Sequence, residues 1–389
     1  MNKIKLGMVG GGSGAFIGGV HRIAARIDDK FELVAGALSS DPTRAHESAR
    51  HLGIEVQRSY SDFKTMAQQE SQRDDGIEAV SIVTPNHMHF PIAKAFLEAG
   101  IHVICDKPMT LNLAEAIELK KIADQSNKLF ILTHNYSAYP IVRQARQMVQ
   151  DGLLGQLRLI QVEYVQDWMT DAAEHSGNKQ AEWRTDPSRS GAAGCLGDIG
   201  THAFNLARFI SDVKLDKVSA DLSTFVEGRM LDDNVHALLR FEQGVKGMMW
   251  TTQVAPGHEN GLKIRVFGSE GGIEWQQENP NHLLYHPHAN PTQIITRAGY
   301  SFSDQHAYLT RTPAGHPEGY LEGFANLYLE TAQVIQKVKQ GQAVNSALAE
   351  FPLPGTQEGL EGLQFITAML HSSQHDGQWT QLENAHELT

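Results

Sequence analysis

The feature that most constrains the fold is a short apolar run that leads directly into a cluster of glycines. Lys3–Val9 predicts a buried strand, the glycine loop Gly10–Gly14 follows it at once, and Val20–Ile27 predicts a helix. Glycines let the backbone approach a pyrophosphate, and a helix N-terminus offers free N–H groups and the positive end of a dipole. The order of strand, loop and helix favours a dinucleotide site over the alternative, a merely flexible turn.

The spacing within this loop is irregular. Gly10 and Gly12 match the first two glycines of the G-x-G-x-x-G pattern, but Ala15 occupies the third position. Gly18 takes the third role if Ser13–Ile17 form an insertion. The residues expected beside the cofactor here are Gly10, Gly12, Ser13, Phe16 and Ile17.

Strands and helices alternate through the first third of the chain. Further strands are predicted at Phe31–Leu38, Ala79–Val83, Ile101–Cys105 and Leu129–Thr133. Helices are predicted at Pro42–Leu52, with Asp41 as N-cap, and at Pro91–Ala99 and Leu113–Ser126. Strands separated by helices of this length pair in parallel through right-handed crossovers. Residues 1–135 are therefore expected to form a Rossmann domain with a doubly wound parallel sheet.

The pattern changes after about residue 136. Longer strands with period-2 alternation are predicted at Leu157–Gln166, Lys217–Phe225, Asn234–Phe241, Gly247–Thr252 and Lys263–Gly268. Helices at Pro140–Asp151, Gly200–Ile210 and Tyr320–Gly341 are expected to cover one face of their sheet. The fold class is thus α/β, with a second, α+β domain over 136–389 that holds a large, open, mainly antiparallel sheet. The Pro-, Gly- and His-rich stretch Asn279–Gly319 is expected to be a long irregular excursion near the site.

Composition excludes several classes of protein. A chain of 389 residues exceeds one hydrophobic core, and a net charge of −12 argues against a nucleic-acid surface. No apolar run approaches the ~20 residues of a membrane helix, and the start does not resemble a signal peptide. The two cysteines, Cys105 and Cys195, suit no metal site. We expect a cytoplasmic protein with no bound metal and no nucleic-acid or membrane partner.

The end of the second strand bears on the choice of cofactor. An acid at this place ordinarily binds the ribose 2′-hydroxyl of NAD, and here Ser39 and Ser40 stand in its place. Arg44 attracts a 2′-phosphate, whereas Asp41 repels one. NAD and NADP both stay open, with NAD slightly favoured.

Three motifs resemble those of one family. The segments Thr84–His89 (TPNHMH), Cys105–Pro108 (CDKP) and Gly197–His202 (GDIGTH) are similar to signatures of the glucose–fructose oxidoreductase/inositol dehydrogenase/MocA family. The resemblance implies a catalytic set of Lys107, Asp198 and His202. It also implies cofactor contacts from Thr84, Pro85, Asn86, His89, Asp106, Lys107, Pro108 and Asn135. Asp106 replaces the glutamate that is usual in the family.

The chemistry of these residue types fits that role. Oxidising a secondary alcohol requires a base for the hydroxyl proton while a hydride leaves to the cofactor. A lysine at the carboxyl end of a strand stabilises developing alkoxide, and a histidine side chain ordinarily titrates near neutral pH. Asp198 and His202 are four residues apart and share one face of a helix. The alternative is that Lys107 caps a turn and that the other two form a surface pair.

Aromatic and polar residues elsewhere suit a ring-shaped, polyhydroxylated substrate. Aromatic rings stack on sugars, and amides, acids and arginines hydrogen-bond their hydroxyls, although core packing is the commoner role of any single aromatic. The sequences QDW at 166–168 and WR at 183–184 look like those of sugar- and inositol-oxidising family members. The expected substrate contacts are Lys107, Asn135, Tyr136, Gln166, Trp168, Trp183, Arg184, Asp198, His202 and His316.

The resemblance therefore predicts hydride transfer from a secondary hydroxyl of a sugar, glycoside or inositol to NAD or NADP. Two alternatives stay open: an NAD-dependent glycosidase of the same fold, and a non-catalytic dinucleotide-binding regulator. Alternating strands such as 235–239 and 248–250 leave apolar side chains for a partner sheet. Members of the family commonly associate through this sheet, so a homo-dimer or homo-tetramer is expected.

Overall fold

The computed structural model describes residues 3–382. Its contacts divide the chain into two compact units, Met1–Asn135 with Leu321–Leu360, and Tyr136–Tyr320 with Glu361–Thr389. The division at Asn135 lies where the sequence pattern changes. Residues 321–360, which were expected in the second domain, instead pack with the first unit.

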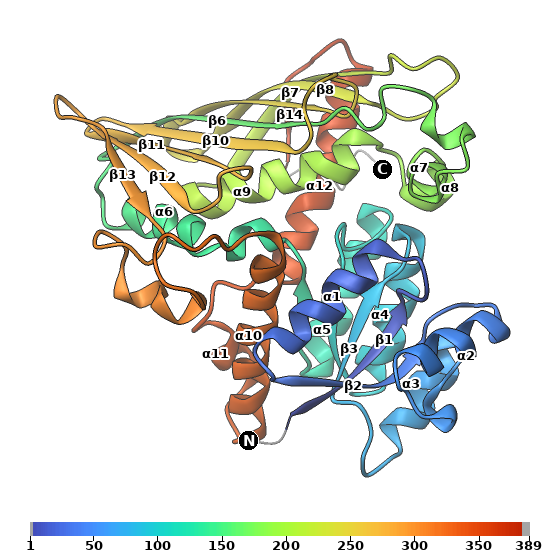
Figure 1. Ribbon diagram of the computed structural model, residues 1–389. Helices are drawn as coiled ribbons and strands as arrows, with labels where there is room; N and C mark the ends of the chain where they lie inside the picture. Colours follow the sequence, from blue (N-terminus) through green and yellow to red (C-terminus); the bar gives the residue numbers. More distant parts are fainter. Residues whose placement is uncertain (1–2, 383–389) are drawn as a thin grey trace. The chain divides into compact units, whose positions relative to one another are not determined.

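The first unit is built on a five-stranded parallel sheet of order β2-β1-β3-β4-β5 (Figure 1). The strands are β1 Ile4–Gly10, β2 Phe31–Ala37, β3 Ala79–Val83, β4 His102–Cys105 and β5 Phe130–Leu132. Each strand end lies within one residue of its predicted place, because strands buried on both faces read as continuous apolar runs. The predicted doubly wound sheet is confirmed.

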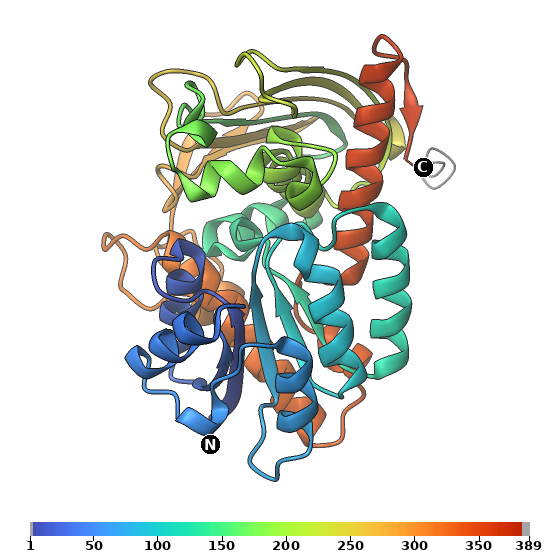
Figure 2. The ribbon, with the colours of Figure 1, turned by 90° about the vertical axis from the view of Figure 1, so that its right-hand side faces the viewer.

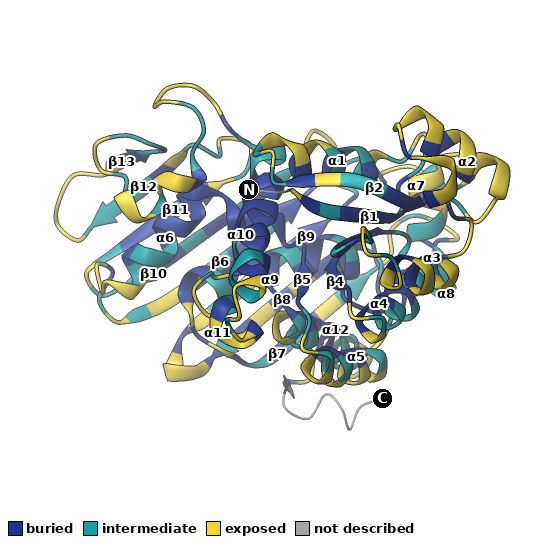
Figure 3. Cartoon of the chain, turned by 90° about the horizontal axis from the view of Figure 1, so that it is seen from below, coloured by how far each residue is buried: buried dark blue, intermediate teal, exposed yellow. Residues whose placement is uncertain are grey.

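Helices cover this sheet on two sides. They are α1 Phe16–Ile27, α2 Pro42–His51, α3 Phe63–Ser71, α4 His89–Glu98, α5 Leu113–Ser126, α10 Tyr320–Lys339 and α11 Val344–Leu348. The helices α3, α4 and α5 pack side by side, while α10 packs against α1 and is buried along most of its length, unlike the exposed α2 (Figure 3). Asp41 caps α2 as predicted, accepting the Arg44 N–H at 2.8 Å. The sequence patterns gave no sign of α3, whose apolar positions are sparse.

A buried hydrogen-bonded triangle explains why residues 321–360 belong to the first unit. Nδ1 of His21 on α1 lies 2.9 Å from the Tyr328 hydroxyl on α10, and Ser81 on β3 lies 3.1 Å from that nitrogen and 2.9 Å from that hydroxyl. Tyr328 also packs edge-on against Phe31 of β2. One helix from late in the chain thus supplies both a polar partner and an apolar surface to the first sheet.

The second unit is built on a nine-stranded sheet of order β13-β12-β11-β10-β6-β9-β8-β7-β14, in which β6 and β9 form the parallel pair. The strands are β6 Leu157–Val165, β7 Leu215–Ser223, β8 Asn234–Phe241, β9 Lys246–Thr252, β10 Gly261–Gly268, β11 Gly271–Gln276, β12 His282–Pro287, β13 Gln293–Thr296 and β14 Thr380–Gln381. The mainly antiparallel prediction is confirmed. The prediction of an irregular excursion over 279–319 is wrong in part, because β12 and β13 extend the sheet there.

Helices cover one face of this sheet, where α6 Pro140–Gln150 and α9 Thr201–Ser211 lie (Figures 1 and 2). The second part of α12 Thr356–Gln374 joins them, with Phe204 and Phe365 stacked at 4.4 Å between ring centres. The short helices α7 Lys179–Arg184 and α8 Pro187–Ser190 lie in the connection from β6 to α9. The remaining helical turns are η1 Val56–Arg58, η2 Asn86–Met88, η3 Asn135–Ala138, η4 Ala173–His175, η5 Leu196–Gly200, η6 Glu242–Gly244 and η7 Asp304–Leu309.

The alternation along the strands separates two faces. Ile160 and Val162 of β6 are buried toward the helices. On the opposite face Leu159, Leu238 and Met248 are 52%, 53% and 49% exposed, and the last two are direct cross-strand partners. The part of the chain that the structure describes contains no helix long and apolar enough to cross a membrane.

Buried histidines make the stability of the first unit depend on pH. Nδ1 of His102 on β4 accepts the Leu129 N–H at 2.9 Å, and burial lowers the pKa of this imidazole to about 4. An unfolded chain binds the same proton near pH 6.5. The unfolded state is therefore favoured as the pH falls from 6.5 toward 4, and the stability is fully present only above that window.

We expect His102→Asn to lose less stability than the wild type between pH 6.5 and pH 4. Asparagine keeps an acceptor oxygen near the place of Nδ1 but does not titrate. The wild type should lose up to about 1.4 kcal/mol of unfolding free energy per pH unit through this residue. Urea unfolding at pH 7 and pH 5 measures the difference, with the exposed His51→Asn as control. Equal acid sensitivity of the wild type and the His102 variant would contradict the assignment.

Candidate functional site

The glycine loop after β1 has the geometry of a phosphate cradle. Gly10 and Gly11 have φ angles of +80° and +72°, where side chains are strained. A Cβ on Gly18 would lie 2.4 Å from Cα of Gly11, and one on Gly12 would lie 2.7 Å from the Leu38 carbonyl oxygen. The helix α1 begins at Phe16, four residues before its predicted start, so Gly18 supplies the close packing of helix against loop. The residues present therefore fit a dinucleotide, whose phosphates need close backbone approach at a helix N-terminus.

Two side chains that the sequence motif did not reveal hold this loop. The Ser13 N–H donates to Oγ of Ser48 on α2 at 3.1 Å, and the Arg22 guanidinium on α1 donates to the Gly11 carbonyl oxygen. Phe16 is largely exposed at the start of α1, whereas Ile17 packs on the core cluster that includes Met8. The loop is thus fastened to both flanking helices.

Ser39 and Asp41 are hydrogen-bonded to each other directly after the end of β2. Oγ of Ser39 accepts the Asp41 N–H at 3.2 Å, and Asp41 in turn caps α2. Ser40 and Arg44 are exposed beside them. The negative charge of Asp41 is therefore held in place by the helix that it caps.

The turn after β3 and the end of β4 are joined through one imidazole. His89, which is buried, has Nδ1 2.7 Å from the Pro108 carbonyl oxygen and Nε2 2.9 Å from that of Thr84. Pro85 precedes the helical turn η2, whose Asn86 is also buried. Because a neutral imidazole has one N–H, it donates to one of the two carbonyls at a time. Burial lowers the pKa of His89 and so favours this neutral form.

Asp106 and Lys107 directly follow β4. One carboxylate oxygen of Asp106 accepts the Lys107 N–H at 2.9 Å and the Thr133 hydroxyl at 3.0 Å, and the Lys107–Pro108 peptide is cis. The short carboxylate therefore fixes the backbone of Lys107 and ties the end of β4 to that of β5. Burial, and then the charge of Lys107, lower the pKa of His134 to about 3. Asn135 follows, buried, with its N–H donating to the Thr133 carbonyl oxygen at 2.9 Å.

In the second unit, Asp198 lies in the π-helical turn η5 and His202 in the first turn of α9. A single regular helix was expected here, and the π-turn is a correction to that expectation. One carboxylate oxygen of Asp198 accepts Nε of Arg184 at 3.1 Å and Nε2 of Gln253 at 3.0 Å. The His202 ring stands edge-on to Tyr136, with centres 4.9 Å apart. The structure therefore gathers four of the predicted substrate residues around one helical turn.

A chain of amide groups continues from Asp198. Nε2 of Gln253 also lies 3.3 Å from Oε1 of Gln166, and that oxygen accepts the Trp168 indole N–H at 3.1 Å. Nε2 of Gln166 donates to Oδ1 of Asn260 at 2.8 Å. Gln253 and Asn260 were not predicted, because neither belongs to a motif and their contacts span more than 50 residues of sequence.

The chain ends at two buried tyrosines. The Tyr164 hydroxyl donates to Oδ1 of Asn260 at 2.8 Å and lies 2.7 Å from the Tyr136 hydroxyl. Burial raises the pKa of both phenols, so both stay protonated at neutral pH. The arrangement offers fixed donors and acceptors beside an imidazole, which suits a polyhydroxylated molecule.

Three predicted residues, Trp168, Trp183 and His316, lie differently from the expectation. The Arg184 guanidinium stacks on Trp183 at 4.3 Å and lies 5.9 Å from Trp168, so a cation occupies ring surface that was expected for a sugar. His316 is exposed, and its carbonyl oxygen accepts from Arg297. The structure does not bring the His316 side chain together with the group around Asp198.

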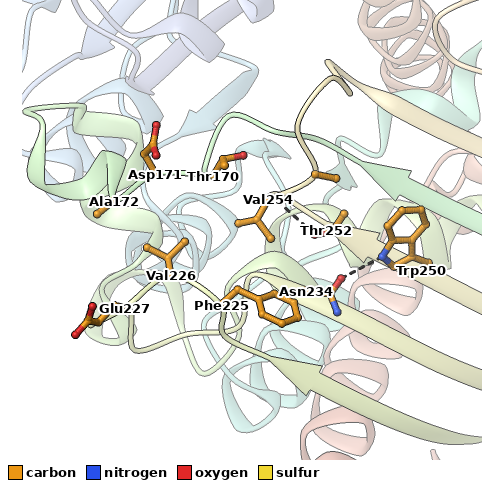
Figure 4. Close-up of a pocket in the computed structure, with 11 residues that line it drawn as sticks. Thr170, Asp171, Ala172, Phe225, Val226, Glu227, Asn234, Trp250, Thr252 and Val254 are labelled. Atoms are coloured by element: carbon orange, nitrogen blue, oxygen red, sulfur yellow. Dashed lines mark hydrogen bonds between the residues drawn. The ribbon is translucent and has the colours of Figure 1, made fainter.

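A pocket of about 640 Å³ opens elsewhere in the second unit (Figure 4). Its lining includes Phe225, Asn234 and Trp250, and the Trp250 indole donates to Asn234 at 3.1 Å. None of its lining residues is a predicted site residue. Over residues 3–382, no group of three or more histidine, cysteine or acidic side chains is arranged to hold a metal ion.

Comparison with known proteins places these features in a family. Residues 4–134 match the model of an oxidoreductase family with an NAD-binding Rossmann fold, and residues 142–274 match that of the GFO/IDH/MocA C-terminal domain. An oxidoreductase structure from Sinorhizobium meliloti is 51% identical, with a TM-score of 0.88 over 97% of this chain and 99% of its own. An inositol dehydrogenase homologue from Azotobacter vinelandii, solved with NADH and myo-inositol, is 35% identical, with a TM-score of 0.91 over 98% of each chain. The levoglucosan dehydrogenase of Pseudarthrobacter phenanthrenivorans is 30% identical over 313 residues, 73% of this chain and 76% of its own.

The carboxamide of Gln253 is predicted to be essential for a stable carboxylate at Asp198. Gln253→Glu places a second acidic group against Asp198 and Gln166, with no donor left between them. We expect the variant to unfold at pH 7 with about 1–3 kcal/mol less free energy than Gln253→Met, the control without a charge. Chemical unfolding at pH 7 measures the difference, and equal stability of the two variants would count against the contact.

Proposed function

The chain belongs to the Gfo/Idh/MocA oxidoreductase family, and we propose that it oxidises a secondary hydroxyl of an inositol, sugar or glycoside with NAD. The observation that carries the proposal is the presence of Lys107 after β4 of an NAD-binding domain together with Asp198 and His202 in the C-terminal domain. The similarity to dehydrogenases of inositol and of levoglucosan supports the same class of substrate.

In the proposed reaction the three residues act on one substrate hydroxyl. The bound nicotinamide supplies the hydride acceptor. The Lys107 ammonium donates a hydrogen bond to the hydroxyl oxygen and stabilises its developing negative charge. His202 accepts the hydroxyl proton. The carboxylate of Asp198, held by Arg184 and Gln253, positions the substrate and favours the imidazolium that forms.

The residues around Asp198 fit a substrate that carries several hydroxyls. Gln166, Gln253 and Asn260 already bond one another in a fixed order, so their remaining lone pairs and N–H groups point in defined directions. A polyol ring hydrogen-bonds such a set in one orientation, which selects the carbon that is oxidised. Arg184, stacked on tryptophan, keeps its planar donors in place.

NAD is the proposed cofactor rather than NADP. Asp41 is fixed at the N-terminus of α2 by its own capping bond, next to Ser39. A 2′-phosphate at this position would meet that negative charge, whereas a 2′-hydroxyl hydrogen-bonds to serine or aspartate.

We expect purified protein to reduce NAD with at least one member of a panel of inositols, pyranoses and glycosides, and to do so less well with NADP. Lys107→Met and His202→Asn should each lower kcat by about 10²- to 10⁴-fold and leave NAD binding intact. Their effects should not multiply, because both act on one hydroxyl. Absorbance of the reduced cofactor measures turnover, and fluorescence titration measures binding.

The outcomes separate the candidate functions. Glycoside cleavage without net cofactor reduction would indicate the glycosidase, and NAD binding without any turnover would indicate the regulator. Turnover within a few-fold of the wild type in either variant would remove that residue from the reaction.

We also propose that the chain forms a homo-dimer or homo-tetramer through the face of the large sheet that carries Leu159, Leu238 and Met248. Trp250 lies on the same face, two residues along β9 from Met248. Apolar side chains that are half exposed in adjacent strands favour coverage by another copy.

Light scattering at micromolar concentration should therefore give the mass of a dimer or a tetramer. The double variant Leu238→Glu/Met248→Glu should shift the mass toward that of a monomer. An interface through this face would then have to bury two neighbouring carboxylates, one on each strand. Ile117→Glu, at an exposed apolar position on α5, is the control and should keep the wild-type mass. A monomeric wild type would refute the proposal.

A further inference from the structure

A buried carboxylate from outside the Asp198 segment binds the start of the turn that carries Asp198. Asp232 precedes β8, and its two oxygens accept the N–H groups of Gly194 and Leu196, each at 2.7 Å. The Asp232 carbonyl oxygen also accepts the Cys195 N–H at 2.8 Å. Three successive N–H groups at the beginning of this helical segment are thus bound by one residue 36 to 38 positions away.

We propose that Asp232 is a positioning residue for the reaction, holding the π-turn so that Asp198 and His202 keep their places. The proposal rests on the proposed function of those two residues. It adds a residue that belongs to none of the motifs in the sequence.

A single residue, Gly194, connects Asp232 to Asp198 through hydrogen bonds. Gly194 donates its N–H to the Asp232 side chain, and its carbonyl oxygen accepts the Asp198 N–H at 2.9 Å. That carbonyl shares a peptide group with the Cys195 N–H, which the Asp232 carbonyl oxygen accepts, so a shift of this backbone moves Asp198 directly. The two backbones are too close for any side chain at position 194, because a Cβ there would lie 2.3 Å from the Asp232 carbonyl oxygen.

The next residue, Asp233, is linked to Asp198 through Gln253. The Asp233 carbonyl oxygen accepts the Gln253 N–H at 3.0 Å, and the side chain of Gln253 donates to Asp198. Asp233 itself is paired with Arg229, which Glu174 also binds. Residues 232 and 233 thus set both the backbone turn and the side-chain partner of Asp198.

An ionised carboxylate accepts well from both N–H groups, one with each oxygen. A protonated carboxyl carries one hydroxyl, which faces a donor and leaves one N–H poorly satisfied. Burial raises the pKa of Asp232 to about 6, against the lowering effect of the two N–H donors and with a smaller contribution from Asp233. The other charged or titratable groups nearby are the Cys195 thiol, Asp198 and, through Asp233, Arg229.

The test compares Asp232→Asn with Asp232→Glu and with a control, Asp74→Asn, at an exposed position after α3. Asparagine has one acceptor oxygen and turns an NH₂ group toward the second N–H, whereas glutamate keeps both oxygens. We expect kcat of Asp232→Asn to fall at least tenfold with an unchanged Kd for NAD. Asp232→Glu should recover part of the loss, and Asp74→Asn should match the wild type.

A second measurement does not depend on activity. Hydrogen exchange of the Gly194 and Leu196 amides should be at least tenfold faster in Asp232→Asn, with exchange in β1 and β3 unchanged. In the wild type, exchange at these two amides, corrected for its intrinsic pH dependence, should increase as the pH falls below about 6. The wild-type comparison holds even if the asparagine variant does not fold.

The results separate this inference from the proposed function. Unchanged exchange at Gly194 and Leu196, or a kcat of Asp232→Asn within twofold of the wild type, would overturn the positioning role. Faster exchange in the Asp232→Asn variant of a protein that oxidises nothing on the panel would support the hydrogen bonds from Gly194 and Leu196 to Asp232. The same result would refute the proposed dehydrogenase activity.

Discussion

The parallel pairing of five short strands is the constraint on which the first unit depends. It brings the carboxyl ends of all five strands to one edge of the sheet, so residues that are far apart in sequence end up as neighbours there. Gly10 ends β1, Thr84 follows β3, and Asp106 follows β4. Two contacts then lock adjacent strand ends, the Thr133 hydroxyl on Asp106 and the His89 imidazole between the turn after β3 and Pro108. Lys107 is therefore presented from a backbone that is bonded on both sides.

The second unit holds two carboxylates, Asp198 and Asp232, in largely buried surroundings. Asp198 meets an arginine and a carboxamide, while Asp232 meets backbone N–H groups. In each case the charge is matched by donors that are themselves fixed, as buried charges require. The π-turn that carries Asp198 is a local irregularity that is anchored at its start by hydrogen bonds from outside the helix.

The sequence predicted what depends on local pattern and missed what depends on distant contacts. The five parallel strands were located within one residue, because apolar runs and the glycines that follow them are local signals. Gln253 and Asn260 gave no such signal, since a glutamine on a strand end looks the same whether or not it bonds an aspartate. The amphipathic helix α10 was predicted to within two residues, but its pattern shows which face is buried and not which sheet buries it. The π-turn was missed because GDIGTH fits a regular helix equally well.

The return of residues 321–360 to the first unit has a consequence for the order in which the chain is made. His21 and Ser81 leave the ribosome early, but their partner Tyr328 is synthesised only after the whole large sheet except β14. The same holds for Leu132, whose N–H donates to the Pro354 carbonyl oxygen. The Rossmann sheet is therefore synthesised well before the helix that completes its cover beside α1, with the large sheet translated in between. The unit that begins first is completed near the end of synthesis, and during that interval the apolar surface that α10 later covers is exposed to other chains.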